Sequence, residues 1–557
     1  CSDKTGTLTQ NRMTVQQAWV GGELLPCSAL QTQNAAQSRL LDIALLACDA
    51  TLNPDGGAVG DPTEIALVRW GDAVGRPAAA LRAAHPRLEE LAFDSDRKLM
   101  SALFLVGGVP TLYTKGAMDV LLARSTHVLT AQGPVPLTEE WLQRITRANN
   151  AFSGQGLRVL AFGFRPLPQA GPLRLEDEQG YTFAGLVSMM DPPRPESIQA
   201  VADAKRGGIR TIMITGDHKV TATAIARQIG ISAQGDLSLD GAELNAMSDA
   251  QLDEALPRIS VYARVAPEHK IRIVEAWQRR GCVVAMTGDG VNDAPALKRA
   301  DVGVAMGVTG TEVSKDAASM ILADDNFATI VKAVVNGRGV FANIKNAVQF
   351  LLSGNTAGIL AVLYASFASL PAPFAPVHLL FINLLTDSLP AIAIGTEAAR
   401  PGLLDQPPRD PTRPLLDRPL LLTVLGQGLL IAAATLAAFY LGYQGGSAAL
   451  ASTMAFATLT LARLFHGFSC RGPEPLFRLG FRGNRLSLLA FGGGVALLAA
   501  VLFLPGLRTL FLAVPLTGAQ LAQVAGLAFT PTALIQLLKS LRVFLCSRGR
   551  KTADCNK

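Results

Sequence analysis

Residues 1–13 read CSDKTGTLTQNRM and place one carboxylate between small polar residues and a lysine. Two more acidic segments follow along the chain, TGDH at 215–218 and TGDGVND at 287–293, each after a short apolar run. Strand-like runs that alternate with helical patterns predict a parallel sheet, with ligands at the carboxyl ends of its strands. A carboxylate cluster at that edge suits Mg²⁺ accompanied by phosphate. The carboxylates expected there are Asp3, Asp217, Asp289 and Asp293.

The composition indicates several domains and a membrane half. The 557 residues carry a formal net charge of +6, and their mean hydropathy of +0.29 is high for a wholly soluble protein. Many arginines lie between the apolar stretches of the second half, so the positive charge does not indicate a nucleic-acid partner. Seven cysteines without C-x-x-C spacing indicate reduced thiols in a cytosolic setting. No G-x-x-x-x-G-K-[ST] stretch occurs, so any phosphate chemistry is not of the P-loop kind.

Six apolar segments are long enough to cross a bilayer, which requires about 20 helical residues. The predicted spans are 348–369, 377–396, 420–443, 447–468, 486–505 and 519–540. Basic residues gather in every second loop, at 397–419 and 469–485, and in the tail at 546–557. By the positive-inside rule, these loops, the tail and the first half face the cytoplasm. The sequence therefore predicts a multi-pass protein in a lipid bilayer, and the charge asymmetry disfavours a large soluble core.

Five motifs stand in the order found in P-type cation-transporting ATPases. They are DKTGTLT at 3–9, KGA at 115–117, DPPR at 191–194, TGD at 215–217 and TGDGVNDAPAL at 287–297. The chain resembles that family over essentially its whole length. The resemblance implies an α/β haloacid-dehalogenase-like phosphorylation domain, an inserted α+β nucleotide-binding domain and an all-α membrane domain of six helices. The implied boundaries are 1–18 and 179–340 for phosphorylation, 19–178 for nucleotide binding and 341–545 for the membrane.

The resemblance implies covalent catalysis at the first motif. Asp3 resembles the nucleophile that takes the γ-phosphoryl group of ATP. Mg²⁺ would be held by Asp3, Asp289 and the backbone carbonyl of Thr5. Related phosphatases carry a general acid–base aspartate where Thr5 stands, so the phosphoenzyme should last long enough to drive a conformational change. The other residues implied to bind phosphate or to support the site are Lys270, Thr215, Gly216, Asp217, Asn292 and Asp293, and Thr5 and Arg264 are implied to contact the nucleotide.

The inserted domain is implied to bind ATP. Phe93 would stack on adenine and Lys115 would line the pocket. Without their neighbours, Phe93 would be interpreted as a core residue and Lys98 as a solvated surface charge. Only the surrounding motifs favour a nucleotide-binding role for both residues. Ser95 stands where relatives of the sarcoplasmic-reticulum branch often carry an arginine. The implied nucleotide residues are Glu64, Phe93, Lys98, Lys115, Gly116 and Arg158.

Polar residues in the second predicted span indicate a cation site, because a central aspartate in a membrane helix costs on the order of 3 kcal/mol. Asn383, Thr386 and Asp387 lie at i, i+3 and i+4, on one helical face. Pro390 should loosen the helix and free carbonyls. With Asn355 in the first span, all donors are oxygens, which suits a hard cation. A polar network that only packs helices is the alternative, and the sequence NLLTDSLPA resembles the calcium-ATPase branch.

Two positions in the predicted spans lack the carboxylates of two-ion pumps, and this absence predicts one transported ion per ATP. Pumps of the sarcoplasmic-reticulum type hold two Ca²⁺, and one of their sites uses glutamates where this chain has Gly358 and Thr460. Arg463 is expected to snorkel to the cytoplasmic end of its span. The remaining carboxylates balance one Ca²⁺ and not two, and Mn²⁺ is a second candidate substrate. A pump for Mn²⁺, Mg²⁺ or H⁺ and a membrane-anchored phosphatase are the alternatives; Thr5 and Asp387 disfavour the phosphatase.

The family also carries material before the first motif, namely an actuator domain with T-G-E and a helix with P-E-G-L. Neither motif occurs in this sequence. We therefore expect the C-terminal portion of a longer pump, inactive alone and partnered by the missing N-terminal portion. The expected location is the plasma membrane of a bacterium.

Overall fold

The computed structural model describes residues 1–557 except 5, 54–55, 401, 445, 481–482 and 555–557, and leaves out the side chains of 546–554. The chain divides into two compact units, Cys1–Val331 and Lys332–Lys557.

Parallel strands in the first unit carry the acidic segments at their carboxyl ends. The strands are β1 (Ser2–Asp3), β13 (Met213–Ile214), β14 (Leu237–Asp240), β15 (Ile259–Ala263), β16 (Ala285–Gly288), β17 (Val302–Met306) and β18 (Met320–Leu322). They form two sheets, in the orders β1-β13-β15-β14 and β16-β17-β18. The amide of Thr287 donates to the carbonyl of Cys1 at 3.0 Å, and the amide of Asp3 donates to Oγ1 of Thr287 at 3.0 Å. These bonds tie β1 to β16, so Asp3 lies between the two sheets.

Helices connect these strands, as the alternating sequence pattern predicts. All five residues of β15 are buried, which explains its continuous apolar sequence, ISVYA. Gly230 ends α7 in the left-handed conformation that favours glycine at a helix end. The helices are α6 (Pro195–Arg206), α7 (Lys219–Ile229), α8 (Gly241–Ala246), α9 (Asp249–Ala255), α10 (Pro267–Arg279), α11 (Ala294–Arg299) and α12 (Glu312–Ala317).

A nine-stranded, mainly antiparallel sheet forms the inserted domain. Its order is β10-β9-β12-β11-β8-β7-β6, with β2 paired to β12 and β3 paired to β2. The strands are β2 (Thr14–Val20), β3 (Glu23–Pro26), β6 (Arg87–Asp94), β7 (Leu99–Val106), β8 (Val109–Gly116), β9 (Ser125–Thr130), β10 (Gly133–Pro136), β11 (Arg158–Pro166) and β12 (Tyr181–Met190). The short strands β4 (Thr51–Leu52) and β5 (Ala58–Val59) form a separate pair.

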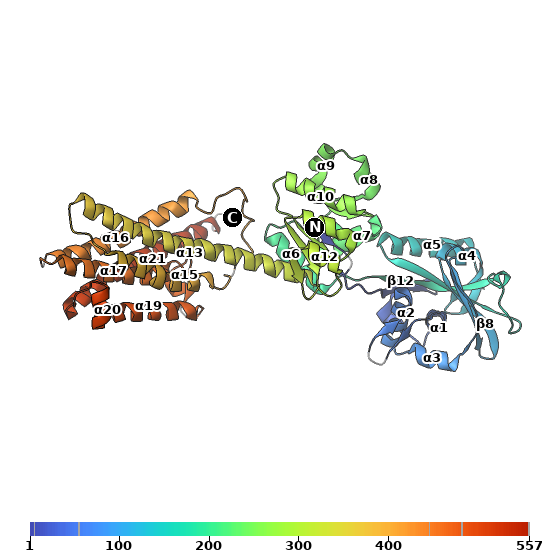
Figure 1. The fold of residues 1–557 in the computed structure, drawn as a ribbon. Helices are drawn as coiled ribbons and strands as arrows, with labels where there is room; N and C mark the ends of the chain where they lie inside the picture. Colours follow the sequence, from blue (N-terminus) through green and yellow to red (C-terminus); the bar gives the residue numbers. More distant parts are fainter. Residues whose placement is uncertain (5, 54–55, 401, 445, 481–482, 555–557) are drawn as a thin grey trace. The chain divides into compact units, whose positions relative to one another are not determined.

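Helices cover both faces of this sheet (Figure 1). α1, α2 and α3 lie on one face, and α4 and α5 lie on the other. The side chain of Asn34 caps α1, and Asp61 caps α2 ahead of a proline at its first position, which are sequence signals for helix starts. The bounds are α1 (Ala35–Leu46), α2 (Pro62–Ala73), α3 (Ala78–Ala84), α4 (Met118–Ala123) and α5 (Glu139–Gly154).

The sheet extends beyond the predicted limits of the insert, 19 and 178. It takes in β2 from Thr14 and β12 up to Met190, because β12 pairs with β11 and also with β2 and β9, and all ten of its residues are buried. The chain passes between the two domains twice, near Thr9 and at the DPPR segment, and hydrogen bonds join these two passages. Asp191 accepts from Oγ1 of Thr9 at 2.5 Å, and Nε of Arg194 donates to the carbonyl of Thr9 at 3.0 Å.

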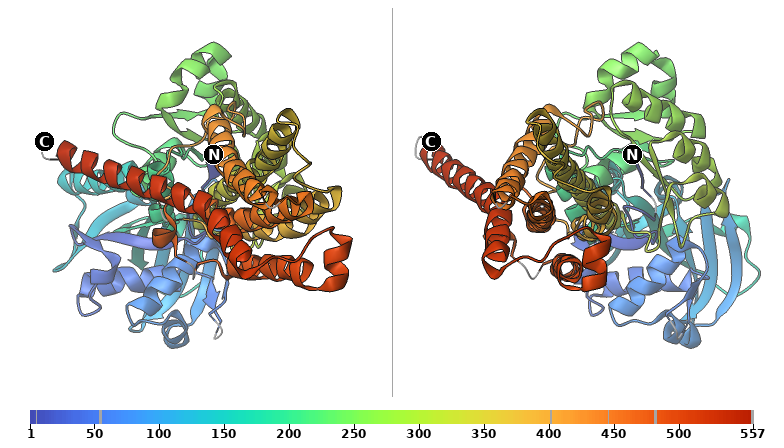
Figure 2. Two further views of the ribbon diagram at one scale, coloured as in Figure 1. Left: turned by 90° about the vertical axis from the view of Figure 1, so that its left-hand side faces the viewer. Right: turned by 60° about the vertical axis from the view of Figure 1, so that its left-hand side comes forward.

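The second unit is helical, and α13 (Phe327–Phe367) runs into it. The spans are α13, a broken helix at Pro376–Gly395, α16 (Arg418–Tyr443), α17 (Ala448–Ser469), α19 (Arg485–Phe503) and α21 (Gly518–Asp554), with short helices α18 (Leu476–Leu479) and α20 (Pro505–Leu510). Within the described residues, these six are long and apolar enough to cross a membrane. α17 packs against α16, α19 and α21. Figure 2 shows a bend in α21, which contains Pro531.

Candidate active site and ion-binding region

Three acidic side chains meet at the carboxyl ends of the parallel strands. Asp3 ends β1, and Asp289 and Asp293 follow β16. One carboxylate oxygen from each lies within 4.8 Å of the other two. Gly288 is required by this packing, because a Cβ at that position would lie 2.4 Å from Cβ of Asp293.

Lys270, on α10, joins two of these carboxylates. Its Nζ donates to Oδ2 of Asp3 at 3.0 Å and to Oδ1 of Asp293 at 2.5 Å. The other oxygen of Asp293 accepts from the amides of Asp289 and Gly290 at 3.2 and 3.1 Å. Asp293 is 3% exposed, so its carboxylate holds the lysine and the loop in place, whereas Asp3 and Asp289 are only partly buried.

The electrostatics of the cluster favour a bound cation. Burial raises the pKa of Asp3, an effect that Lys270 opposes and Asp293 reinforces. Burial, and next the charges of Asp3 and Asp293, raise the pKa of Asp289. Burial lowers the pKa of Lys270, but the two aspartates outweigh it and leave that pKa raised. One ammonium among three acids leaves negative charge uncompensated, and hard oxygen donors of this kind fit Mg²⁺.

The TGD segment borders the cluster. Lys4 follows Asp3 in the chain, and its buried ammonium pairs with Oδ2 of Asp217. Oγ1 of Thr215 accepts from the amide of Asp217 at 3.1 Å, and the amide of Arg264 donates to the carbonyl of Asp217 at 3.0 Å. Arg264 has a positive φ of 47°, which only the surrounding contacts can hold.

The remaining predicted residues of this site lie at its rim. Gly216 and Asn292 are exposed, and a Cβ at Gly216 would meet no atom within 4 Å, which leaves open space at the end of the strand that pairs with β1. Thr5 lies outside the described residues.

The predicted nucleotide residues gather at one edge of the nine-stranded sheet. Leu99 at the start of β7 lies opposite Gly116 at the end of β8, and Gly116 lies opposite Ala161 in β11. This register puts Lys98, Gly116 and Arg158 on neighbouring strand ends. A Cβ at Gly116 would lie 2.2 Å from the carbonyl oxygen of Lys98, so only glycine permits this close approach.

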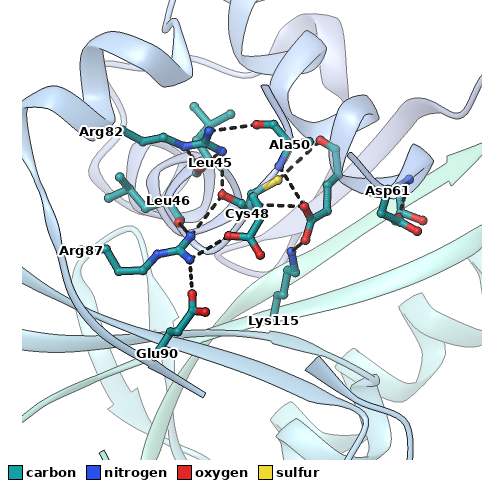
Figure 3. A network of polar contacts seen from close by, with 12 residues as sticks. Leu45, Leu46, Cys48, Ala50, Asp61, Arg82, Arg87, Glu90 and Lys115 are labelled. Atoms are coloured by element: carbon teal, nitrogen blue, oxygen red, sulfur yellow. Dashed lines mark hydrogen bonds and ion pairs between the residues drawn. The ribbon is translucent and has the colours of Figure 1, made fainter. Parts of the chain in front are cut away.

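Lys115 and Glu64 form a buried ion pair in this region (Figure 3). The other oxygen of Glu64 accepts from the amides of Asp49 and Ala50 at 2.8 and 3.0 Å. Arg82 donates to the carbonyls of Leu45, Cys48 and Ala50, and so fixes the loop that holds Glu64.

Phe93, in contrast, is 63% exposed at the end of β6, and Lys98 is exposed at the start of β7. Phe93 is therefore not a core residue, the place that it would favour if taken alone. An exposed aromatic beside a lysine at the edge of a sheet can stack on a planar ring.

The membrane carboxylate lies beside an irregular helical turn. Between α14 (Pro376–Phe381) and α15 (Ser388–Gly395), residues Ile382–Thr386 form a π-helical turn, in which the amide of Asp387 donates to the carbonyl of Ile382 at 2.9 Å. The helix is thus irregular on the N-terminal side of Pro390. Thr386 and Asp387 are buried, but Asn383 is exposed, so the three do not share one environment.

Arg463 does not snorkel, and that prediction is wrong. Its guanidinium, on α17, pairs with Asp387, and Nη2 also donates to Oδ1 of Asn355 at 3.1 Å. The side chains of Arg463 and Asp387 are 4% and 3% exposed. The pairing turns the arginine inward, because a buried charge needs a partner more than it needs the end of the helix. Two of the candidate cation ligands, Asp387 and Asn355, therefore already contact a fixed positive charge.

Two charged residues that were not predicted as site residues, Arg463 and Lys4, occupy positions in the sequence that are themselves informative. A charged residue inside a membrane span is rare and usually pairs with another charge, so the position of Arg463 within α17 is a signal for a buried partner. Lys4 stands next to the predicted nucleophile, and that position is the signal for a partner of the TGD aspartate.

Comparison with known proteins agrees with this architecture. Residues 36–196 match the family described as P-type ATPase, cytoplasmic domain N, and residues 371–541 match Cation transporting ATPase, C-terminus. A calcium-transporting ATPase of Listeria monocytogenes is 44% identical over 550 residues, 97% of this chain and 62% of the relative. A calcium-transporting ATPase of Bacillus subtilis is 37% identical over 559 residues, 96% of this chain and 63% of the relative. A cation-transporting ATPase of Synechocystis is 37% identical over 557 residues, 94% and 61% of the two chains.

The two matched ranges cover most of the inserted nine-stranded domain and most of the apolar helices. The chain carries the N domain and the C-terminal part of the P-type cation-transporting ATPases, and over nearly its whole length it is similar to relatives named for calcium transport. It spans about 62% of the length of the first relatives it matches.

Proposed function

We propose that the chain performs the ATP-consuming chemistry of a cation pump, with Asp3 as the phosphate acceptor. A carboxylate oxygen of Asp3 attacks the γ-phosphorus of ATP, the bond to the β-phosphate oxygen breaks, and ADP leaves. The cluster of Asp3, Asp289 and Lys270 supports this most directly, because phosphoryl transfer depends on positioning and charge neutralisation.

Each side chain around Asp3 has its own role in this proposal. Asp3, Asp289 and the carbonyl of Thr5 would hold Mg²⁺, which supplies positive charge beside the phosphoryl oxygens. Lys270 adds a second positive charge on the opposite carboxylate oxygen, and Asp293 keeps it in place. Gly216 and Asn292 lie at the open rim, Thr215 is buried next to Gly216, and Lys4 pairs with Asp217. Thr215, Gly216 and Asn292 would bind phosphate oxygens.

We assign ATP binding to the edge of the nine-stranded sheet. Phe93 stacks on adenine from its exposed position, and Lys115 with Glu64 lines the pocket. Lys98, Gly116 and Arg158 complete the edge through the register of β7, β8 and β11.

We assign Ca²⁺ as the transported ion, one per ATP. Asp387 is the one acidic residue in the six candidate membrane spans of the described chain, where the last span runs from Gly518 to Leu545, and Arg463 offsets its charge. Two Ca²⁺ would bring four positive charges into a region that already holds an arginine, and uncompensated charge at that depth is too costly. The relatives named for calcium transport support the choice of ion, and a bacterial plasma membrane is the proposed location.

Labelling with [γ-³²P]ATP tests the proposal on the complete pump in its native membrane. Acid-stable, hydroxylamine-sensitive label should depend on Ca²⁺ and vanish in Asp3→Asn. Label that survives Asp3→Asn would overturn the acceptor, and label that follows Mn²⁺, Mg²⁺ or pH instead of Ca²⁺ would overturn the ion. Rapid hydrolysis of p-nitrophenyl phosphate without stable label would favour a phosphatase.

A further inference from the structure

A buried carboxylate lies next to the strand ends to which we assign ATP binding. Glu178, just before β12, has a side chain that is 0% exposed. Its Oε1 accepts from Nη1 of Arg97 and from Oγ of Ser101 at 2.6 Å, and its Oε2 accepts from Nη1 of Arg124 at 3.1 Å. The chemistry assigned to Asp3 makes no use of this carboxylate.

Arg97 connects Glu178 to the turn that presents Phe93 and Lys98. Its Nη2 donates to the carbonyl of Ala92, the residue before Phe93, while its Nη1 pairs with Glu178. Within the same turn, Oδ1 of Asp94 accepts from the amide of Arg97 at 2.8 Å. The guanidinium therefore fixes both ends of the β6–β7 turn to one buried anion.

Ser101 extends the cluster to the strand of Lys115. Its Oγ lies 2.8 Å from Oγ1 of Thr114, the residue before Lys115, and Oγ1 of Thr114 donates to the hydroxyl of Tyr181 at 3.0 Å. One carboxylate thus orders the two segments that carry the aromatic and the lysines of the proposed pocket.

The energetics favour a geometric role over a stabilising one. Removing a carboxylate and two guanidinium groups from water is expensive, and their attraction roughly repays that cost. What such a cluster does supply is a single arrangement, because every member has a fixed hydrogen-bond partner. A turn that projects an exposed aromatic has few apolar contacts to fix it by other means.

We propose that Glu178 is a positioning residue of the nucleotide site, which acts through Arg97 on the β6–β7 turn and through Ser101 and Thr114 on β8. The inference rests on the proposed place of ATP. Without the buried charge, the turn samples several conformations, and ATP must select one of them.

The test uses the full chain in detergent and the variant Glu178→Gln, which keeps the shape and loses the charge. ATP is titrated by calorimetry without Mg²⁺, and amide hydrogen exchange is followed at residues 94–98. Asp42→Asn is the matched control, because Asp42 on α1 pairs with Arg76 at 2.6 Å in the same domain. We expect the Kd for ATP to rise about tenfold and the turn to exchange faster in Glu178→Gln only. Arg97→Lys keeps the positive charge but loses the guanidinium that bonds both Glu178 and the carbonyl of Ala92. It should show a smaller rise in the Kd for ATP and a smaller increase in the exchange of the turn.

The outcomes separate this inference from the proposed site. Unchanged affinity and unchanged exchange in Glu178→Gln, or equal losses in Asp42→Asn, would overturn the positioning role. If Glu178→Gln fails to fold, Arg97→Lys decides by the same two readouts. Phe93→Ala and Lys115→Ala report on the site itself: if neither weakens ATP binding, the proposed pocket fails, and hydrogen exchange alone then decides whether Glu178 orders the turn.

Discussion

Arg463 on α17 pairs with Asp387 beside the π-helical turn, and both side chains are almost entirely buried. The residues are 76 positions apart in the chain. Oδ1 of Asp387 and Nε of Arg463 have no hydrogen-bond partner among the described residues. The pair therefore leaves one buried carboxylate oxygen without a hydrogen-bond partner in the described part of the chain, beside a fixed positive charge.

Replacing Arg463 by Met should destabilise the protein by about 3–5 kcal/mol, because Asp387 is left charged and buried without a partner. The double variant Arg463→Met/Asp387→Asn should recover most of that loss. Thermal unfolding in detergent without divalent cations measures both. Arg418→Met, at the exposed start of α16, is the control. Equal destabilisation of the single and double variants would show that the unpaired charge of Asp387 is not what destabilises Arg463→Met.

In the complete pump, transport should consume one ATP for each Ca²⁺, with a Hill coefficient near one for Ca²⁺-dependent phosphorylation. The physical reason is the single carboxylate of the spans and the arginine that offsets it. Parallel measurement of ⁴⁵Ca²⁺ uptake and ATP hydrolysis in membrane vesicles gives the ratio. A ratio near two would contradict the prediction, and so would full transport by Asp387→Asn.

Lys270→Ala should slow phosphorylation from ATP by about 10²–10³-fold, because the ammonium that neutralises charge at Asp3 is lost. The rate of ³²P incorporation in a rapid-quench experiment measures the effect. Lys298→Ala, on an exposed position of α11, should leave the rate unchanged. If the two variants behave alike, Lys270 has only a structural part in the cluster.

Phe93→Ala should weaken ATP binding by about 0.5–1.5 kcal/mol, the range of an aromatic stacking contact, and should barely change the unfolding midpoint because Phe93 is exposed. Calorimetric titration and thermal unfolding of the same preparation give the two numbers. Leu105→Ala, another exposed apolar residue of this sheet, is the control for affinity. A large loss of stability in Phe93→Ala would place that ring in a core.

Cys27 and Cys48 should resist maleimide at pH 7.5, whereas the exposed Cys282 should react. Burial raises the pKa of Cys27 to about 12 and that of Cys48 to about 11, and only the thiolate is the nucleophile. Because a raised pKa keeps the neutral thiol at every pH below it, raising the pH to 9 should still leave both unlabelled. Peptide mapping by mass spectrometry, with a guanidinium-unfolded sample as the positive control, reports each site. Labelling of Cys48 at the rate of Cys282 would show that its loop opens.

The sequence by itself determined the class of the protein and the edge at which its chemistry lies. Asp3 and Asp289 follow strand-like runs, and the carboxyl ends of parallel strands share one edge, so the strand pattern alone predicts that the two carboxylates meet. The six apolar helices followed from length and hydropathy alone. These are local properties, set by residues that are neighbours in the chain.

Only the tertiary structure decided where the charged side chains point and what they pair with. Residues 176–178 are all acidic, but packing under the sheet buries the carboxylate of Glu178 completely and leaves the other two more accessible. Arg463 could extend to the cytoplasmic end of its helix or pair with an acidic residue inside the membrane domain. The position of Asp387 on another helix determined that it pairs. Such choices depend on desolvation and on partners far away in the chain, and a local sequence pattern carries neither.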